Sequence, residues 1–177
     1  MSFIGDVKKG TTYAPGYFLA NGDEEIIRET KQIAQNSALV VTSEDGTKHV
    51  PMGTAYPTND ANAVGILYED VDVTVGDMPG SVVTGQAEVY EDRLAVTGES
   101  YDAVTPQTGD NPKEKGWYER SGSAGSYVYT LTTDTTVDSQ KTYYARSDVR
   151  LASAAKTALA ALGFKFIASA PAVTRPY

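Results

Sequence analysis

The sequence predicts a mainly β fold: a β-sandwich or barrel-like domain with one amphipathic helix near its end and a small β insertion. Apolar and polar residues alternate over 70–75 and 80–91, as they do in strands that bury one face. Asp45-Gly46 separates two short strand-like runs, which is typical of a hairpin turn. Apolar residues recur at helical spacing over 148–162.

Changes in composition divide the chain into three parts. Residues 1–20 are rich in Gly, Thr, Tyr and Pro without clear periodicity, and they predict an extended N-terminal arm. Residues 21–96 together with 147–177 predict one β-rich domain. Residues 97–146 begin with a Gly-, Pro-, Thr- and Asp-rich stretch and continue with an aromatic β pattern, which indicates an inserted module.

The first half of the main domain predicts one weak helix and several strands. Ile26, Ile27 and Ile33 follow acidic residues at the spacing of a helix over 23–36. The runs 38–42 and 48–52 flank the Asp45-Gly46 turn and predict a β-hairpin. Beyond them, two strands within 63–91 are expected to be joined by a turn at Met78-Pro79-Gly80.

The amphipathic helix of the predicted fold lies over 148–162. Ser147 and Asp148 suit its N-cap and first turn, and Gly163 suits its end. The expected buried face comprises Leu151, Ala154, Ala155, Ala158, Leu159 and Leu162. Inside the insertion, Trp117-Tyr118, Tyr127–Leu131 and Lys141–Ala145 predict a unit of two or three strands. So small a unit should lean on the main domain or on a neighbouring subunit through its aromatic residues.

Composition excludes several classes of function. The chain has no cysteine, so disulfides, thiolate nucleophiles and zinc–thiolate sites are absent. A net charge of −8 opposes binding to nucleic acid, which needs clustered Lys and Arg. No apolar run approaches the ~20 residues that cross a bilayer. The sequence begins without the pattern of a secretory signal, so we expect synthesis in a cytoplasm. We expect no cofactor.

The single histidine and several acidic residues admit a catalytic or metal-binding interpretation beside a structural one. His49 is the single histidine and lies beside the predicted hairpin, without a nucleophile-elbow sequence nearby. The sequence therefore predicts no enzyme. A calcium site built from oxygen ligands is the metal alternative, but the EF-hand spacing is missing and a solvated strand face is favoured. The acidic residues in question are Asp60, Asp70, Asp72, Asp77, Glu91 and Asp92.

One stretch carries a family resemblance. VPMGTAYPTNDANAVGILYEDVDVT, residues 50–74, resembles the signature of head fibre and capsid decoration proteins from phages of Gram-positive bacteria. That family pattern continues with a Glu/Asp-x-Arg-Leu element, an Ala-rich helix and a terminal strand, and this chain has Glu91-Asp92-Arg93-Leu94, the region 148–162 and Phe164–Ile167. It departs from the pattern by placing about fifty residues between them (97–146).

The resemblance implies a non-enzymatic virion structural protein made in the bacterial cytoplasm. It implies a β-rich base that binds the exterior of the capsid, commonly as a homotrimer at three-fold positions, with the major capsid protein of a tailed phage as partner and a stabilising effect on the shell. Nucleic acid and membrane are not among the implied partners. The capsid-contact candidates, taken from the arm and the 50–62 segment, are Tyr13, Tyr17, Phe18, Tyr56, Asn59 and Asp60.

The alternative function is a carbohydrate-binding or adhesion module displayed on a virion. Exposed aromatic clusters mark recognition sites, and here they would contact a host glycan. The favoured interpretation is instead that the aromatic residues form the core of the insertion. The surface-recognition candidates are Trp117, Tyr118, Tyr143 and Tyr144, with Tyr127 and Tyr129 beside them in the sequence.

Overall fold

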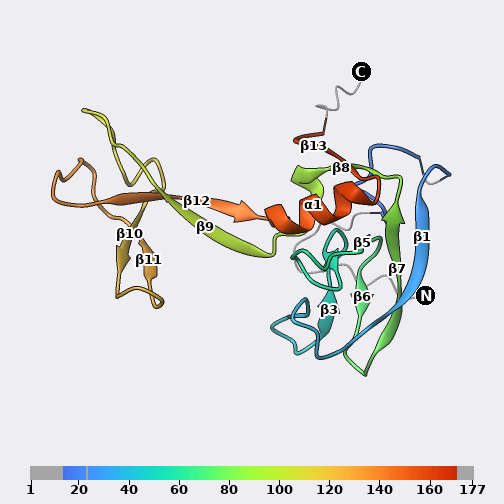
Figure 1. The fold of residues 1–177 in the computed structure, drawn as a ribbon. Coiled ribbons are helices and arrows are strands. Elements are labelled where there is room, and N and C mark those ends of the chain that lie inside the picture. Colours follow the sequence, from blue (N-terminus) through green and yellow to red (C-terminus); the bar gives the residue numbers. More distant parts are fainter. Residues whose placement is uncertain (1–13, 23, 171–177) are drawn as a thin grey trace, which may run out of the picture. The chain divides into compact units, whose positions relative to one another are not determined.

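The computed structural model describes residues 14–22 and 24–170, and its chain divides into two compact units. Unit 1 comprises the residues up to Thr97 and those from Arg150 onward, and unit 2 is Gly98–Val149. The sequence predicts the two boundaries after residues 96 and 146, whereas the structure has them after Thr97 and Val149. Within the described residues the fold is mainly β with one α-helix, as predicted, and its four sheets do not close into a barrel (Figure 1).

Unit 1 contains three of the sheets. A four-stranded sheet has the order β1-β7-β5-β4, with β1 at Ile27–Ile33, β7 at Met78–Gly85, β5 at Gly65–Leu67 and β4 at Ala55–Tyr56. A three-stranded sheet joins β2 (Val41–Thr42), β3 (Lys48–Val50) and β6 (Val71–Asp72). In the third sheet, β8 (Glu88–Tyr90) pairs in parallel with β13 (Lys165–Ile167), and the 3-10 helix η1 (Glu91–Arg93) follows β8.

Strand β7 is the centre of unit 1 because it pairs on both sides. Its residues Val82 and Val83 are fully buried and lie opposite Leu67 and Ile66 of β5. Val82 contributes to one apolar cluster and Val83 to another, so this strand lies between two small cores. The first core comprises Phe18, Ala55, Ala63, Ile66, Tyr68, Val83, Ala87, Val89, Leu94, Ala155, Leu159 and Phe164, and the second comprises Ile33, Val50, Leu67, Val71, Val73 and Val82.

Helix α1 (Ser153–Ala161) covers the first core through Ala155 and Leu159, both fully buried (Figure 1). Gly163 adopts a φ of 90° just after the helix, so its predicted role as the stop is confirmed. The predicted start is wrong, because Ser147 and Asp148 belong to a strand of unit 2. Ala154 and Leu162, both expected on the buried face, are exposed, and Leu162 lies beyond the last turn.

Two further local predictions in unit 1 need correction. The segment expected as a helix over 23–36 instead contains β1, whose backbone pairs along seven residues with β7. Pairing with a strand about fifty residues away supplies hydrogen bonds that a local helical pattern cannot anticipate. Met78-Pro79-Gly80 is the start of β7 rather than a turn, and the chain reverses earlier, at Gly76. The hairpin of β2 and β3 around Asp45-Gly46 is confirmed.

The described end of the predicted arm is part of unit 1. Phe18 is fully buried in the first core, and Leu19 forms a β-bridge with Val89. The extended arm over 1–20 is therefore wrong for residues 14–20, because an apolar side chain there fills the core. Residues 1–13 lie outside the described part of the chain.

Unit 2 is one four-stranded antiparallel sheet, where two or three strands were predicted. Its order is β11-β10-β12-β9. Strand β9 (Gly98–Ala103) comes from the Gly-, Pro-, Thr- and Asp-rich stretch, for which no strand is predicted, and it pairs along its whole length with β12 (Tyr143–Val149). Strand β10 (Tyr118–Ser121) joins β12 to the edge strand β11 (Val128–Leu131).

Candidate functional site

Four tyrosines gather on one face of the unit 2 sheet, one from each strand. Tyr118 of β10 lies directly opposite Tyr144 of β12. Tyr129 of β11 lies opposite Arg120, two residues along β10 from Tyr118, and Tyr101 of β9 lies opposite Arg146, two residues along β12 from Tyr144. Residues two apart on a strand share a face, so all four rings and both arginines stand on the same side. We call this set the tyrosine cluster.

The rings of the tyrosine cluster pack against one another. Tyr101 and Tyr129 come from the two outer strands, yet their rings stack in parallel with centroids 3.9 Å apart. Tyr118 meets Tyr101 edge-on at 5.2 Å, and Tyr144 meets Tyr129 edge-on at 5.3 Å. The Arg120 guanidinium lies 5.0 Å from the Tyr144 ring centroid. Edge-to-face and stacked pairs of this kind stabilise a small sheet, and they use ring faces that a sugar would need.

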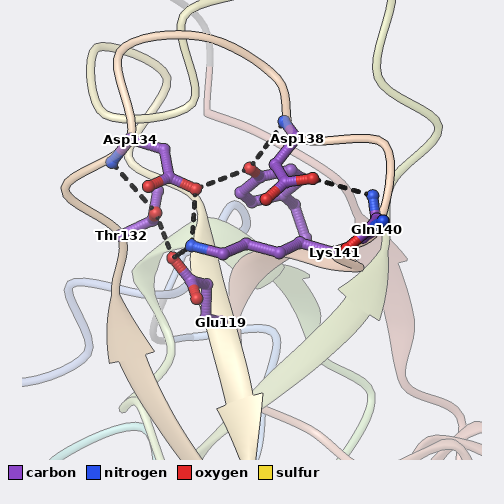
Figure 2. Close-up of polar contacts among 7 residues, drawn as sticks. Glu119, Thr132, Asp134, Asp138, Gln140 and Lys141 are labelled. Carbon is purple, nitrogen blue, oxygen red and sulfur yellow. Dashed lines mark hydrogen bonds and ion pairs between the residues drawn. The ribbon is translucent and has the colours of Figure 1, made fainter.

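The opposite face of the sheet carries a polar network around Lys141 and Tyr143 (Figure 2). The Lys141 ammonium lies 3.1 Å from Glu119 Oε1 and 2.8 Å from Asp134 Oδ2. The Tyr143 hydroxyl donates to the same Asp134 oxygen at 2.7 Å and accepts a hydrogen bond from the Asp138 amide at 3.1 Å. These contacts fasten the loop between β11 and β12 to the sheet.

The electrostatics of this network favour a structural role. Hydrogen bonds from Lys141 and Tyr143 lower the pKa of Asp134, and the two carboxylates raise the pKa of Lys141. Burial raises the pKa of the Tyr143 hydroxyl. At neutral pH Lys141 is therefore a paired ammonium rather than a free amine nucleophile, and Tyr143 stays a neutral phenol. Asp134 is thus held as a carboxylate, Lys141 as an ammonium and Tyr143 as a neutral phenol.

The four surface-recognition candidates predicted from the sequence differ in how far they are exposed to solvent. Trp117, Tyr143 and Tyr144 are buried, with 9% or less of their surface exposed, so they do not form an exposed stacking platform. Tyr118 is partly exposed within the tyrosine cluster. The sequence did not single out Tyr101 or Arg120, because Tyr101 precedes the recognisable β pattern and Arg120 joins the cluster only through the pairing of β10.

No family model matches the chain, and neither a curated protein nor a solved structure matches it.

The capsid-contact candidates of unit 1 are not equally available to a partner. Phe18 is fully buried, which excludes its side chain, and Tyr13 lies outside the described residues. Tyr17 is partly exposed and packs under the Arg93 guanidinium, 4.3 Å from its ring centroid. Tyr56 is also partly exposed, and its hydroxyl donates to the Gln32 carbonyl oxygen at 3.1 Å.

Asn59 and Asp60 hold the 50–62 segment in place. The Asn59 amide donates to Thr97 Oγ1 at 3.0 Å and to the Arg150 carbonyl oxygen at 3.2 Å, and it accepts from the Ala152 amide at 2.9 Å. Asp60 is exposed, and its carboxylate accepts hydrogen bonds from the Thr58 hydroxyl and the Asn62 amide, which lower its pKa. The loop over 58–62 is therefore an ordered surface feature, fastened where the chain leaves and re-enters unit 1.

The acidic residues named above as possible calcium ligands instead accept local hydrogen bonds or form ion pairs. Asp70 accepts from the Met52 amide at 2.6 Å and Asp77 from the Gln35 amide at 2.8 Å. Glu91 pairs with Lys156 at 2.7 Å, and Asp92 accepts from the Ala170 amide. Among the residues that the structure describes, no three His, Cys, Asp or Glu side chains are grouped to hold a metal ion.

His49 lies on β3, where its cross-strand neighbours are Val41 and Asp72. Hydrogen bonds from the Thr74 hydroxyl and from the Thr74 amide, the latter at 2.8 Å, lower the pKa of the Asp72 carboxyl.

Unit 2 has a shallow depression of about 340 Å³, and the two cationic side chains that line it form ion pairs: Lys115 with Asp110 and Arg146 with Glu99. It is lined by Lys115, Gly116, Trp117, Tyr118, Ala145, Arg146 and Asp148.

No helix in the described ranges is long and apolar enough to span a membrane.

Proposed function

We propose that this protein is a non-enzymatic structural protein that binds the exterior of a tailed-phage capsid through unit 1, as a head fibre or decoration subunit. The observation that carries the proposal is the ordered 50–74 segment, whose sequence carries the family resemblance. Its strands β3 to β6 supply buried residues to both cores of unit 1. Between β4 and β5 it leaves one loop, 58–62, at the surface.

The chemistry of the loop suits a docking surface that forms without conformational change. Asp60 binds the backbone of its own turn, and Asn59 ties the loop to Thr97 and Arg150. A loop ordered before binding loses little conformational entropy on docking. We propose that Tyr17, Tyr56 and the loop contact the major capsid protein, that the bound form is a homotrimer, and that docking stabilises the shell, because selective binding to an assembled state stabilises that state.

The test is co-sedimentation of the full-length protein with capsids of a tailed phage from a Gram-positive host, followed by cryo-electron microscopy. We expect extra density at the three-fold lattice positions. Ala61→Arg adds bulk and charge to an exposed loop position, and we expect it to weaken capsid binding about tenfold or more. Ala124→Arg makes the same change on an exposed loop of unit 2 and should bind like the wild type. Bare capsids at micromolar wild-type protein would overturn the proposal.

A shorter N-terminal deletion tests the arm. Removal of residues 1–20 would delete Phe18 from the first core and destabilise unit 1. A loss of capsid affinity in that variant could then result from unfolding rather than from a missing contact. Deletion of 1–13 leaves every described contact of Phe18 intact. We expect this variant to lose capsid affinity if Tyr13 contributes a contact, and an unchanged affinity would assign docking to Tyr17, Tyr56 and the loop alone.

The adhesion alternative rests on what remains exposed in unit 2. Tyr127 is 42% exposed, and the Arg120 guanidinium lies 4.1 Å from its ring centroid. This pair is the part of the aromatic surface with a ring accessible to a sugar. Binding of the wild-type protein to a glycan array, lost in Tyr127→Ala without a change in capsid binding, would support adhesion through unit 2.

A further inference from the structure

Edge strand β11 differs from the other long edge strands of the described sheets. Edge strands present unpaired backbone groups, and proteins commonly protect them with charged residues. Strand β1 carries Arg28, Glu29 and Lys31, and β9 carries Glu99 and Asp102. Strand β11 has the sequence Val-Tyr-Thr-Leu, and the chain from Ser121 to Thr133 contains no charged residue at all.

Apolar side chains on β11 are also exposed. Val128 is 59% exposed and Leu131 52% exposed, although both lie in a regular strand. Strand β11 is thus a short, uncharged strand of high β propensity at the sheet edge, beside β10 (Figure 1), and the exposed Tyr127 directly precedes it. A strand of this composition is a template for pairing with another strand.

The hydrogen bonds of the neighbouring residues show which backbone groups face outward. The Thr132 amide donates to the Trp117 carbonyl oxygen at 2.9 Å, so the backbone of residue 132 points toward the β10 side. Backbone groups alternate sides along a strand, so Thr130 points the same way, while Tyr129 and Leu131 direct their N–H and C=O groups outward. Two residues of the edge are therefore available for a ladder.

We propose that β11 pairs antiparallel with β11 of a second copy of this chain, in the register that places Thr130 opposite Thr130. In that register Tyr129 of each copy faces Leu131 of the other, and each such pair exchanges two backbone hydrogen bonds. The Tyr–Leu and Thr–Thr cross-strand pairs are favourable, and no charge is brought into the joint. A second copy fits because β11 is itself an uncharged strand whose outward groups match this register.

The pairing closes at two copies. A two-fold axis through the joined β11 strands makes one eight-stranded sheet from two units, and both of its outer edges are then β9. Glu99 and Asp102 on β9 bring like charges together if that edge pairs with another copy of itself. The inference concerns the free protein and uses unit 2 alone, whereas the homotrimer proposed above belongs to the capsid-bound form, so either proposal can fail without the other.

A single introduced cysteine tests the register, since the natural chain has none. Directly opposed residues of a non-hydrogen-bonded pair have Cα atoms about 4.5 Å apart, within the range that a disulfide spans. Under copper-phenanthroline and dissolved oxygen, we expect full-length Thr130→Cys to form a covalent dimer rapidly. The matched control Ala124→Cys, in an exposed loop of the same unit, should cross-link at least about tenfold more slowly. Equal rates, or no dimer in either variant, would overturn the proposal.

A charge variant tests the pairing without a cross-link. Thr130→Lys places two ammonium groups against each other across the joint, whereas inside one copy residue 130 lies opposite Glu119, which tolerates a lysine. We expect sedimentation equilibrium to show a wild-type dimer, a Thr130→Lys monomer and an Ala124→Lys dimer, with unchanged Trp117 fluorescence in all three. A monomeric wild type at every concentration, or open-ended polymers, would contradict the closed pair.

Discussion

Asn59 and Arg150 stand 91 positions apart in the chain, yet the Asn59 Nδ2 atom donates a hydrogen bond to the Arg150 carbonyl oxygen. The same side chain also contacts Thr97 and Ala152, so it binds both points at which the chain crosses from one unit to the other. One loop residue thus ties together the segments of unit 1 that flank a 52-residue insertion (98–149).

Substitution Asn59→Ala should destabilise unit 1. It removes the acceptor of the partly buried Ala152 amide, and leaving such a group unsatisfied costs about 1–3 kcal/mol, whereas the Arg150 carbonyl oxygen keeps the Thr97 hydroxyl as a donor. We expect a lower midpoint in urea denaturation followed by far-UV circular dichroism. Asn36→Ala removes an exposed amide and serves as the matched control. Equal midpoints for both variants would show that the Asn59 contacts contribute no net stability.

Substitution Gly65→Ala should disrupt the central sheet. A Cβ atom at this position would lie 2.3 Å from the Val83 carbonyl oxygen and 2.5 Å from Val82 Cγ1, so strand β7 must move. Overpacking against backbone costs about 1–3 kcal/mol or more. Gly22→Ala, where an added Cβ meets nothing within 4 Å, is the control. Thermal unfolding of both variants measures the difference, and a stable Gly65→Ala protein would mean that β5 and β7 separate at little cost.

Substitution Tyr143→Ala should destabilise unit 2 far more than Tyr127→Ala. Tyr143 is fully buried and bonded to Asp134, whereas Tyr127 is 42% exposed. Large-to-small substitutions in a core cost about 3–5 kcal/mol for an aromatic residue, and exposed positions cost little. Trp117, the single tryptophan, reports the unfolding of this unit by its fluorescence. Similar losses in both variants would argue against Tyr143 as a core residue.

The stability of unit 2 should fall in acid. Hydrogen bonds from Lys141 and Tyr143 lower the pKa of Asp134 below its ordinary 3.8, so its stabilising effect is present above that pH and is lost as the pH falls through the lowered folded value. Asp134→Asn cannot titrate, and it should flatten this part of the acid dependence of Trp117 fluorescence. Asp102→Asn, on an exposed edge, should keep the wild-type profile. A flattened profile in the control alone would contradict the assignment.

Removal of the Phe18 side chain should destabilise unit 1 even though residue 18 lies near the start of the chain. Phe18 is fully buried among core residues, and Phe→Ala substitutions cost about 3–5 kcal/mol. Tyr17→Ala changes a partly exposed neighbour and should cost less. Chemical denaturation measures the free energy of unfolding of both variants. An equal loss in the two would indicate that Phe18 is a surface residue rather than a core residue.

Local patterns predicted the elements that depend on local chemistry. Asp45-Gly46 indicated the hairpin because Gly46, at a φ of 84°, supplies the conformation that the turn requires. Gly163 indicated the end of α1 for the same reason. Alternation over 70–75 indicated the buried positions of Val71 and Val73, although Val75 continues the pattern into solvent, with 82% of its surface exposed.

Elements that depend on distant partners were not predictable in this way. Strand β1 has a helical spacing of apolar residues, and only its pairing with β7 decides in favour of a strand. Ser147 and Asp148 look like a helix start, but they pair with Ser100 and Glu99 of β9. The tyrosine cluster likewise requires the order of all four strands, because Tyr101 and Tyr129 come from opposite edges of the sheet.

The close approach of Gly98 and Val149 at the base of unit 2 has a consequence for how this protein can change. They are cross-strand partners, and the flanking Thr97 hydroxyl donates to the Arg150 carbonyl oxygen at 3.1 Å. An insertion whose two ends lie side by side can be accommodated with almost no change in the backbone of the domain that carries it. The 98–149 segment is thus an exchangeable cassette: a different domain with adjacent termini, or a tight turn, can replace it while unit 1 keeps its own hydrogen bonds.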